Sequence, residues 1–134
     1  MDKNLKKLVT FQQGLLNETA AYKELVNILE DKTYTEPLRR IIADREAQIV
    51  KVEKLTGEKL TPKDSDVKYV RRMNRFFGTQ KLFSNLASIM KEKGKETRDL
   101  ADIYPELKII ASAEARYQET FKRLSDLVKK KKKL

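Results

Sequence analysis

Apolar side chains recur at every third or fourth position along most of this chain, which is the spacing of one face of an α-helix. The pattern predicts four long helices, over residues 2–30, 35–56, 79–103 and 104–128. A shorter, basic and amphipathic helix is predicted over residues 66–77. With 4 glycines and 3 prolines among 134 residues, the chain offers few places at which a helix would break.

Residues with strong positional preferences mark the ends of the second helix. Thr35 is predicted as its N-cap, and Pro37 falls in the first turn, where the missing N–H would have no helical partner in any case. Gly57 follows the helix and suits the left-handed backbone conformation with which many helices end. Gly94 is a predicted weak point within the third long helix.

The lengths of the connections predict how the helices are arranged. Short segments join the first helix to the second and the third to the fourth, so each pair should form an antiparallel hairpin. The crossover between the two hairpins, residues 57–78, is long enough to run the length of a bundle. Two hairpins joined by one long crossover are typical of ferritin-like proteins. We therefore predict an all-α, ferritin-like four-helix bundle with an extra helix in the crossover.

The composition fits one domain with a charged exterior, since 40% of the residues are apolar and 37% are charged. The net charge is +10, and half of it comes from five consecutive lysines, Lys129, Lys130, Lys131, Lys132 and Lys133. We predict a bundle over residues 1–128 and a lysine-rich tail over residues 129–134. The tail either aids solubility or attracts nucleic acid or a membrane surface by a salt-sensitive charge effect.

The residue types that are missing exclude several classes of chemistry. The chain has no Cys, so disulfides and thiolate catalysis are excluded, and no His, the commonest metal ligand and general base. No apolar run approaches the roughly 18 residues of a membrane span. The first residues, MDKNLKKL, lack the apolar core of a signal peptide. A cytoplasmic location is therefore expected.

Three glutamates lie among apolar residues on the predicted helix faces. Glu18 falls on the stripe of the first helix, Glu46 on that of the second and Glu114 on that of the last. A carboxylate in a protein core is costly unless it is neutralised, paired or bound to a cation. Because each lies near the middle of its helix, we predict that the three meet inside the bundle, where a metal ion is one group that would compensate them.

The chain resembles the ferritin-like domain of the rubrerythrin group, including the form found alone or ahead of vacuolar-iron-transporter-type membrane domains. The resemblance covers nearly the whole chain and depends on the segments NETAAYKEL, LRRIIADREAQIVKVEKLTGEKLTP, RRMNRFFG and YPELKIIASAEARYQETFKRL. It implies a homodimer and a di-iron centre held by glutamates and histidines. Glu18, Glu46 and Glu114 match ligand positions. The remaining ligand positions hold other residues, namely Ile49, Ala87 and Tyr117.

The resemblance therefore implies a degenerate di-iron site, which has lost both histidines and one glutamate and so disfavours an enzymatic role. We predict a non-catalytic structural or interaction module without a cofactor. One alternative is a residual Fe or Mn site in an oxidoreductase or iron-handling protein, and oxygen-preferring Mg²⁺ or Ca²⁺ is also open. In a metal-free interior, Tyr22 and Tyr117 can donate hydrogen bonds to the carboxylates, and Arg45 or Arg116 can fold inward.

Overall fold

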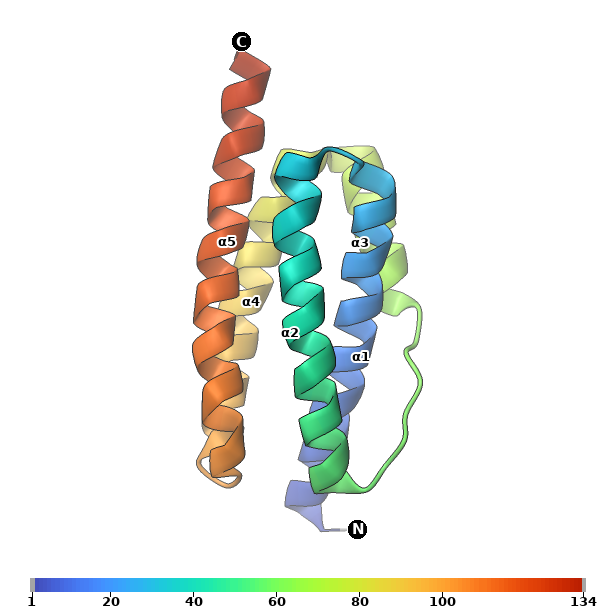
Figure 1. Cartoon of the computed structure of the whole chain (residues 1–134), viewed down its shortest axis with the longest axis vertical. Helices are drawn as coiled ribbons and strands as arrows, with labels where there is room; N and C mark the ends of the chain where they lie inside the picture. Colours follow the sequence, from blue (N-terminus) through green and yellow to red (C-terminus); the bar gives the residue numbers. More distant parts are fainter. Residues whose placement is uncertain (1, 134) are drawn as a thin grey trace. The chain divides into compact units, whose positions relative to one another are not determined.

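The computed structural model describes residues 2–133, which form helices and connecting segments with no strand among them. The predicted all-α class is confirmed, and every predicted helix is present (Figure 1). The elements in chain order are α1 (Lys3–Leu29), α2 (Lys32–Thr56), α3 (Ser65–Phe77), α4 (Thr79–Ala101), a 3-10 turn η1 (Pro105–Leu107) and α5 (Lys108–Lys133).

The helices divide between two compact units, Met1–Arg71 and Arg72–Leu134. In the first unit α1 and α2 pack side by side and run antiparallel, and in the second α4 and α5 do the same (Figure 1). The two predicted hairpins are therefore confirmed. The predicted crossover contains α3, as expected, and the boundary between the units falls within that helix.

The turn between α1 and α2 is tighter than the sequence pattern predicts. It consists of residues 30–31, and the side chain of Asp31 caps α2 by accepting a hydrogen bond from the Thr33 N–H at 2.9 Å. The prediction that Thr35 is the N-cap is wrong, because aspartate is at least as strong a cap and stands four residues earlier. Pro37 consequently lies in the second turn of α2, where it removes one backbone hydrogen bond.

Each hairpin buries one apolar stripe. The buried apolar side chains of the first include Leu8, Leu15, Leu25, Leu38, Ile41 and Val52. Those of the second include Leu82, Leu86, Met90, Leu107, Ile110 and Leu124. The rings of Phe83 on α4 and Phe121 on α5 are fully buried and stack with their centroids 6.4 Å apart. This aromatic pair ties the two helices of the second hairpin together.

Amide side chains on α1 hold the first part of the crossover in place. The segment after α2 has no regular secondary structure over residues 57–63, so its backbone groups need partners from elsewhere. Gln12, which is fully buried, and the half-buried Gln13 and Asn17 supply them. The bonds join Gln12 Nε2 to Glu58 O (2.8 Å), Thr56 Oγ1 to Gln12 Oε1 (2.6 Å), Gln13 Nε2 to Thr61 O (2.9 Å) and Lys63 N to Asn17 Oδ1 (2.7 Å).

Two glycines should respond in opposite ways to alanine. Gly57 ends α2 with φ +71°, and a Cβ there would meet no atom within 4 Å. Gly57→Ala should therefore lower the free energy of unfolding by about 1 kcal/mol through backbone strain alone. Gly94 lies inside α4, where a Cβ would make an ordinary contact with Arg98 at 3.5 Å. Gly94→Ala should raise stability by about 0.5–1 kcal/mol, since alanine loses less backbone freedom.

Urea denaturation of both variants beside the parent chain measures the two effects. Shifts of the same sign for Gly57→Ala and Gly94→Ala would contradict this assignment of helix end and helix interior.

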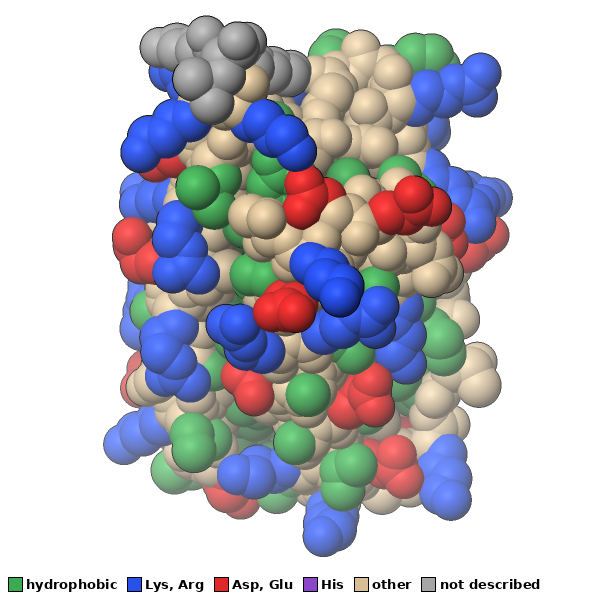
Figure 2. Space-filling view, turned by 45° about the horizontal axis from the view of Figure 1, so that its top comes forward, with side chains coloured by type: hydrophobic (Ala, Val, Ile, Leu, Met, Phe, Trp, Pro, Cys, Tyr) green, Lys and Arg blue, Asp and Glu red, His purple; other side chains and the backbone are tan. Residues whose placement is uncertain are grey.

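The lysine run, as far as the structure describes it, belongs to the last helix. Helix α5 extends to Lys133, and the side chains of Lys129, Lys130 and Lys131 are exposed. The predictions for the side chains of Lys132 and Lys133, and for Leu134, lie outside the described part of the chain. Basic and acidic side chains are interspersed over the face shown in Figure 2. Across the described residues, each helix is too short or too polar to cross a membrane.

Candidate functional site

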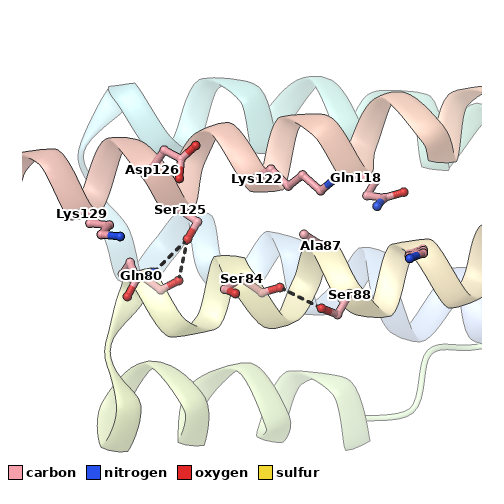
Figure 3. Close-up of a pocket in the computed structure, with 10 residues that line it drawn as sticks. Gln80, Ser84, Ala87, Ser88, Gln118, Lys122, Ser125, Asp126 and Lys129 are labelled. Atoms are coloured by element: carbon pink, nitrogen blue, oxygen red, sulfur yellow. Dashed lines mark hydrogen bonds between the residues drawn. The ribbon is translucent and has the colours of Figure 1, made fainter.

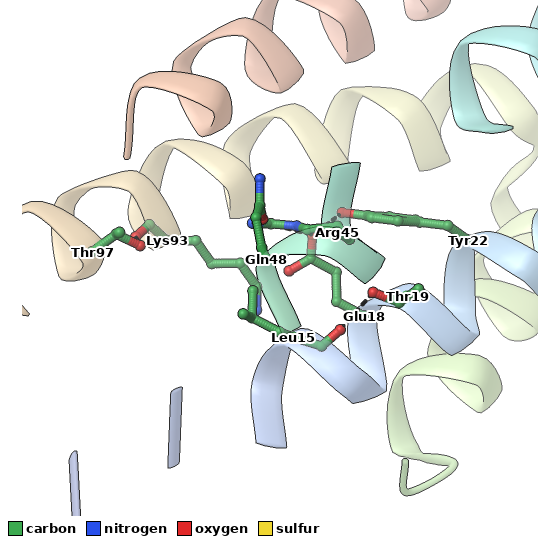
Figure 4. Close-up of polar contacts among 8 residues, drawn as sticks. All are labelled: Leu15, Glu18, Thr19, Tyr22, Arg45, Gln48, Lys93 and Thr97. Atoms are coloured by element: carbon green, nitrogen blue, oxygen red, sulfur yellow. Dashed lines mark hydrogen bonds and ion pairs between the residues drawn. The ribbon is translucent and has the colours of Figure 1, made fainter. Parts of the chain in front are cut away.

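Glu18 is buried on α1, as predicted, and it binds an arginine. Its Oε2 atom accepts hydrogen bonds from Nε of Arg45 at 2.8 Å and from the hydroxyl of Tyr22 at 2.7 Å, and it forms an ion pair with Nη2 of Arg45 at 2.8 Å (Figure 4). Arg45 in turn donates from Nη1 to Oε1 of Gln48 at 2.7 Å. Glu18 is 4% exposed and Arg45 is 0% exposed. We call these four residues the Arg45 cluster.

Helical spacing brings the Arg45 cluster together. Glu18 and Tyr22 are four residues apart on α1, and Arg45 and Gln48 are three apart on α2, so each pair lies on one face of its helix. The planar guanidinium presents one edge to the carboxylate and its remaining nitrogen to the amide. Removing two charges from water is expensive, and these hydrogen bonds are what offset that cost. The cluster therefore pairs a buried carboxylate with a buried guanidinium inside the first hairpin.

Glu46 lies on the surface of α2, so the prediction that it faces the core is wrong. Its carboxylate pairs with Lys23 Nζ at 3.4 Å, with both side chains more than half exposed. The buried stripe of α2 passes through position 45, which is about 100° around the helix from position 46. Val50, one turn further along the same side of α2 as Glu46, is 54% exposed. The stripe prediction chose Glu46 over Arg45 because arginine is rarely buried unless it is paired.

Two details of the metal-free alternative are confirmed by the Arg45 cluster. Tyr22 donates to a buried carboxylate, and Arg45 folds inward. Arg116, the other arginine considered for that role, is exposed on α5. The arginine that accompanies the buried glutamate is thus supplied by the neighbouring helix of the same hairpin.

The second hairpin has its own buried acidic residue. Glu114 and Tyr117 lie one turn apart on α5 and are 1% and 3% exposed, so their predicted burial is confirmed. They lie on the same face of the helix as Ile110 and Phe121, which are fully buried. The carboxylate and the phenol are therefore inside the protein and out of contact with bulk solvent.

The residues present do not fit the di-iron centre that the family resemblance implies. Glu18 already shares its Oε2 with a guanidinium, and Glu46 is on the surface. The three substituted ligand positions supply hydrocarbon or a phenol, at Ile49, Ala87 and Tyr117. Over residues 2–133, no three side chains of the types His, Cys, Asp and Glu lie close enough together to hold a metal ion.

A shallow groove of about 480 Å³ runs between α4 and α5 in the second unit (Figure 3). One of its walls carries Ser125, whose hydroxyl donates to the Gln80 carbonyl and accepts from the Gln80 amide, each at 3.2 Å. Ala87, a substituted ligand position, also lines the groove. Serine, glutamine and lysine side chains make the groove polar, but without histidine or cysteine it lacks a conventional pair of nucleophile and base.

Comparisons with known proteins find no relative of this chain. The resemblance to the rubrerythrin group therefore stays a prediction from the sequence segments quoted above. A scan against models of protein families, and searches of curated proteins and of solved structures, find no match to this chain.

Proposed function

We propose that this chain is a non-catalytic structural or interaction module of the ferritin-like type, in which an internal ion pair takes the place of a metal ion. The observation that carries the proposal is the fully buried guanidinium of Arg45. It binds Glu18, the residue that matches a metal ligand in the family the chain resembles. Two antiparallel hairpins joined by a long crossover support the ferritin-like arrangement.

The guanidinium meets the same electrostatic need that a metal ion meets in a di-iron protein. A buried carboxylate requires a positive charge or a proton nearby. Arginine keeps its charge at every physiological pH, and unlike a metal ion it is covalently part of the chain. Such an interior does not depend on bound metal for its stability. We therefore assign the role of the module to its charged outer surface.

Added metal should leave the stability of the protein unchanged. A site filled at about 100 times its dissociation constant would add about 2.7 kcal/mol to the free energy of unfolding, which raises the melting temperature measurably. We therefore expect the same melting temperature in Fe²⁺, in Mn²⁺ and in EDTA. Elemental analysis after dialysis should find far less than one metal ion per chain.

The glutamate variants give this test its control. Near-stoichiometric iron or manganese in the parent protein, lost in Glu18→Gln and in Glu114→Gln, would overturn the proposal. That result would favour the alternative of a residual metal centre. Glu46→Gln is the matched surface substitution, because its carboxylate faces solvent on α2.

A further inference from the structure

The turn between α3 and α4 presents two adjacent phenylalanines to solvent. Phe76 is 68% exposed and Phe77 is 65% exposed, the largest fractions among the large apolar side chains that the structure describes. Single exposed apolar residues are ordinary, but two neighbouring aromatic rings at one turn indicate a surface that binds something. Three exposed basic residues flank them. We call Arg72, Arg75, Phe76, Phe77 and Lys81 the aromatic tip.

Local hydrogen bonds give the turn a fixed shape. The hydroxyl of Thr79 lies 2.7 Å from Oδ1 of Asn74, and the N–H of Gly78 donates to the Asn74 carbonyl at 3.2 Å. Gly78 adopts φ +88°, a left-handed conformation that L residues rarely adopt. The backbone next to the two rings is therefore fixed by hydrogen bonds, so little of its conformational freedom remains to be lost on binding.

The stretch of sequence that contains the aromatic tip carries charge of one sign. No acidic residue occurs between Asp66 and Glu92, although the chain as a whole has 20 acidic residues. That stretch contains six basic residues, Lys68, Arg71, Arg72, Arg75, Lys81 and Lys91. Two of them have acidic partners outside the stretch, since Lys68 pairs with Asp64 and Arg71 with Glu24. The cations of the tip itself are therefore available for an anionic surface.

We propose that the aromatic tip docks this protein on the surface of a membrane that contains anionic lipids. The rings of Phe76 and Phe77 enter the boundary between headgroups and acyl chains, where aromatic side chains leave water. Arg72, Arg75 and Lys81 stay at the level of the lipid phosphates, to which they are attracted. The guanidinium of Arg75 lies 5.5 Å from the centre of the Phe76 ring, so charge and apolar surface are presented together.

A lipid surface suits this combination better than a nucleic acid does. Phosphates of a nucleic acid would satisfy the cations, but the sequence carries no base-reading motif. A bilayer satisfies the basic and the apolar parts at once, through its headgroups and its hydrocarbon. The inference concerns the outside of the second unit, and it holds whether or not the interior binds metal.

Sedimentation with lipid vesicles tests the proposal. The full chain should bind phosphatidylcholine vesicles that contain about 30 mol% phosphatidylserine, and bind vesicles of phosphatidylcholine alone much more weakly. The double variant Phe76→Ala, Phe77→Ala should lower the partition coefficient by about 10–100-fold. Arg72→Ala should lower it about fivefold at low salt, and added salt should weaken binding by the parent chain.

Matched variants separate the aromatic tip from other basic or apolar surface. Val50→Ala and Ile109→Ala remove exposed apolar groups elsewhere and should leave vesicle binding unchanged. The triple variant Lys129→Ala, Lys130→Ala, Lys131→Ala should retain the dependence on the phenylalanines. Because the substituted side chains are exposed, melting curves should match that of the parent.

Three results would overturn the proposal. The first is an absence of binding to the phosphatidylserine vesicles at low salt. The second is binding that the lysine variant abolishes and the phenylalanine variant does not. The third is a dimer of the parent chain, measured by analytical ultracentrifugation, that the phenylalanine variant dissociates while vesicle binding is absent, which would identify the tip as a contact between copies of the chain.

Discussion

Replacing Arg45 with methionine should lower the free energy of unfolding by about 3–5 kcal/mol, because the change removes the guanidinium that pairs with a buried carboxylate. Glu18 would keep the hydrogen bond from Tyr22 and lose both contacts with the guanidinium. Methionine fills much of the space that the arginine stem occupied, so the loss reports the charge and its hydrogen bonds more than a cavity. Urea denaturation followed by circular dichroism measures it.

Two further variants show whether this loss arises from the buried pair. Arg40→Met removes an exposed arginine from the same helix, where Glu36 lies 4.0 Å away, and should change stability by less than about 1 kcal/mol. Adding Glu18→Gln to Arg45→Met removes the stranded charge and should recover much of the lost stability. If Arg45→Met costs no more than Arg40→Met, or if Glu18→Gln recovers nothing, the Arg45 cluster does not have the role assigned to it.

The secondary structure of this chain is largely readable from its sequence because apolar periodicity dominates it. The C-terminal ends of α1 and α2, at Leu29 and Thr56, lie within one residue of the predicted ends. The short connections predict both hairpins. The N-cap of α2 was misplaced because Asp31 and Thr35 offer the same side-chain chemistry. The choice between them depends on how closely the two helices approach at the turn, which no local pattern records.

About half of the candidate site could be predicted from the sequence. The stripe of α1 correctly placed Glu18 and Tyr22 in the interior. On α2 the same reasoning chose Glu46 over Arg45, because a metal site calls for carboxylates and a guanidinium is a rare core residue. The stripe Leu38, Ile41 and Val52 passes through position 45. Had that geometry been weighed above residue type, it would have identified the arginine as the partner of Glu18.

Long-range polar contacts carry no comparable signal in the sequence. Gln12 stands within an apolar stripe, which indicates burial, but nothing nearby indicates that its partners are Thr56 and Glu58. Amide side chains can pair with any backbone group within reach, so their partners follow from the fold and do not help to predict it. The attachment of the crossover to α1 is for this reason a finding of the structure alone.

The second large effect is expected in the other hairpin, where Phe121→Ala should lower the free energy of unfolding by about 3–5 kcal/mol. Phe121 is fully buried and its ring stacks on Phe83, so truncation removes apolar burial and leaves a cavity between α4 and α5. Ile109→Ala is the matched control on α5, since that side chain is 62% exposed, and it should cost less than about 1 kcal/mol.

A double-mutant cycle with Phe83→Ala then separates the aromatic contact from the burial of each ring. Because the rings touch, the two losses should fail to add, with a coupling of about 0.5–1.5 kcal/mol. Hydrogen exchange shows which helices are destabilised. Amides of α4 and α5 should lose protection in Phe121→Ala by at least as much as those of α1 and α2. Strictly additive losses, or exchange that speeds up only in α1 and α2, would show that this pair does not hold the second hairpin together.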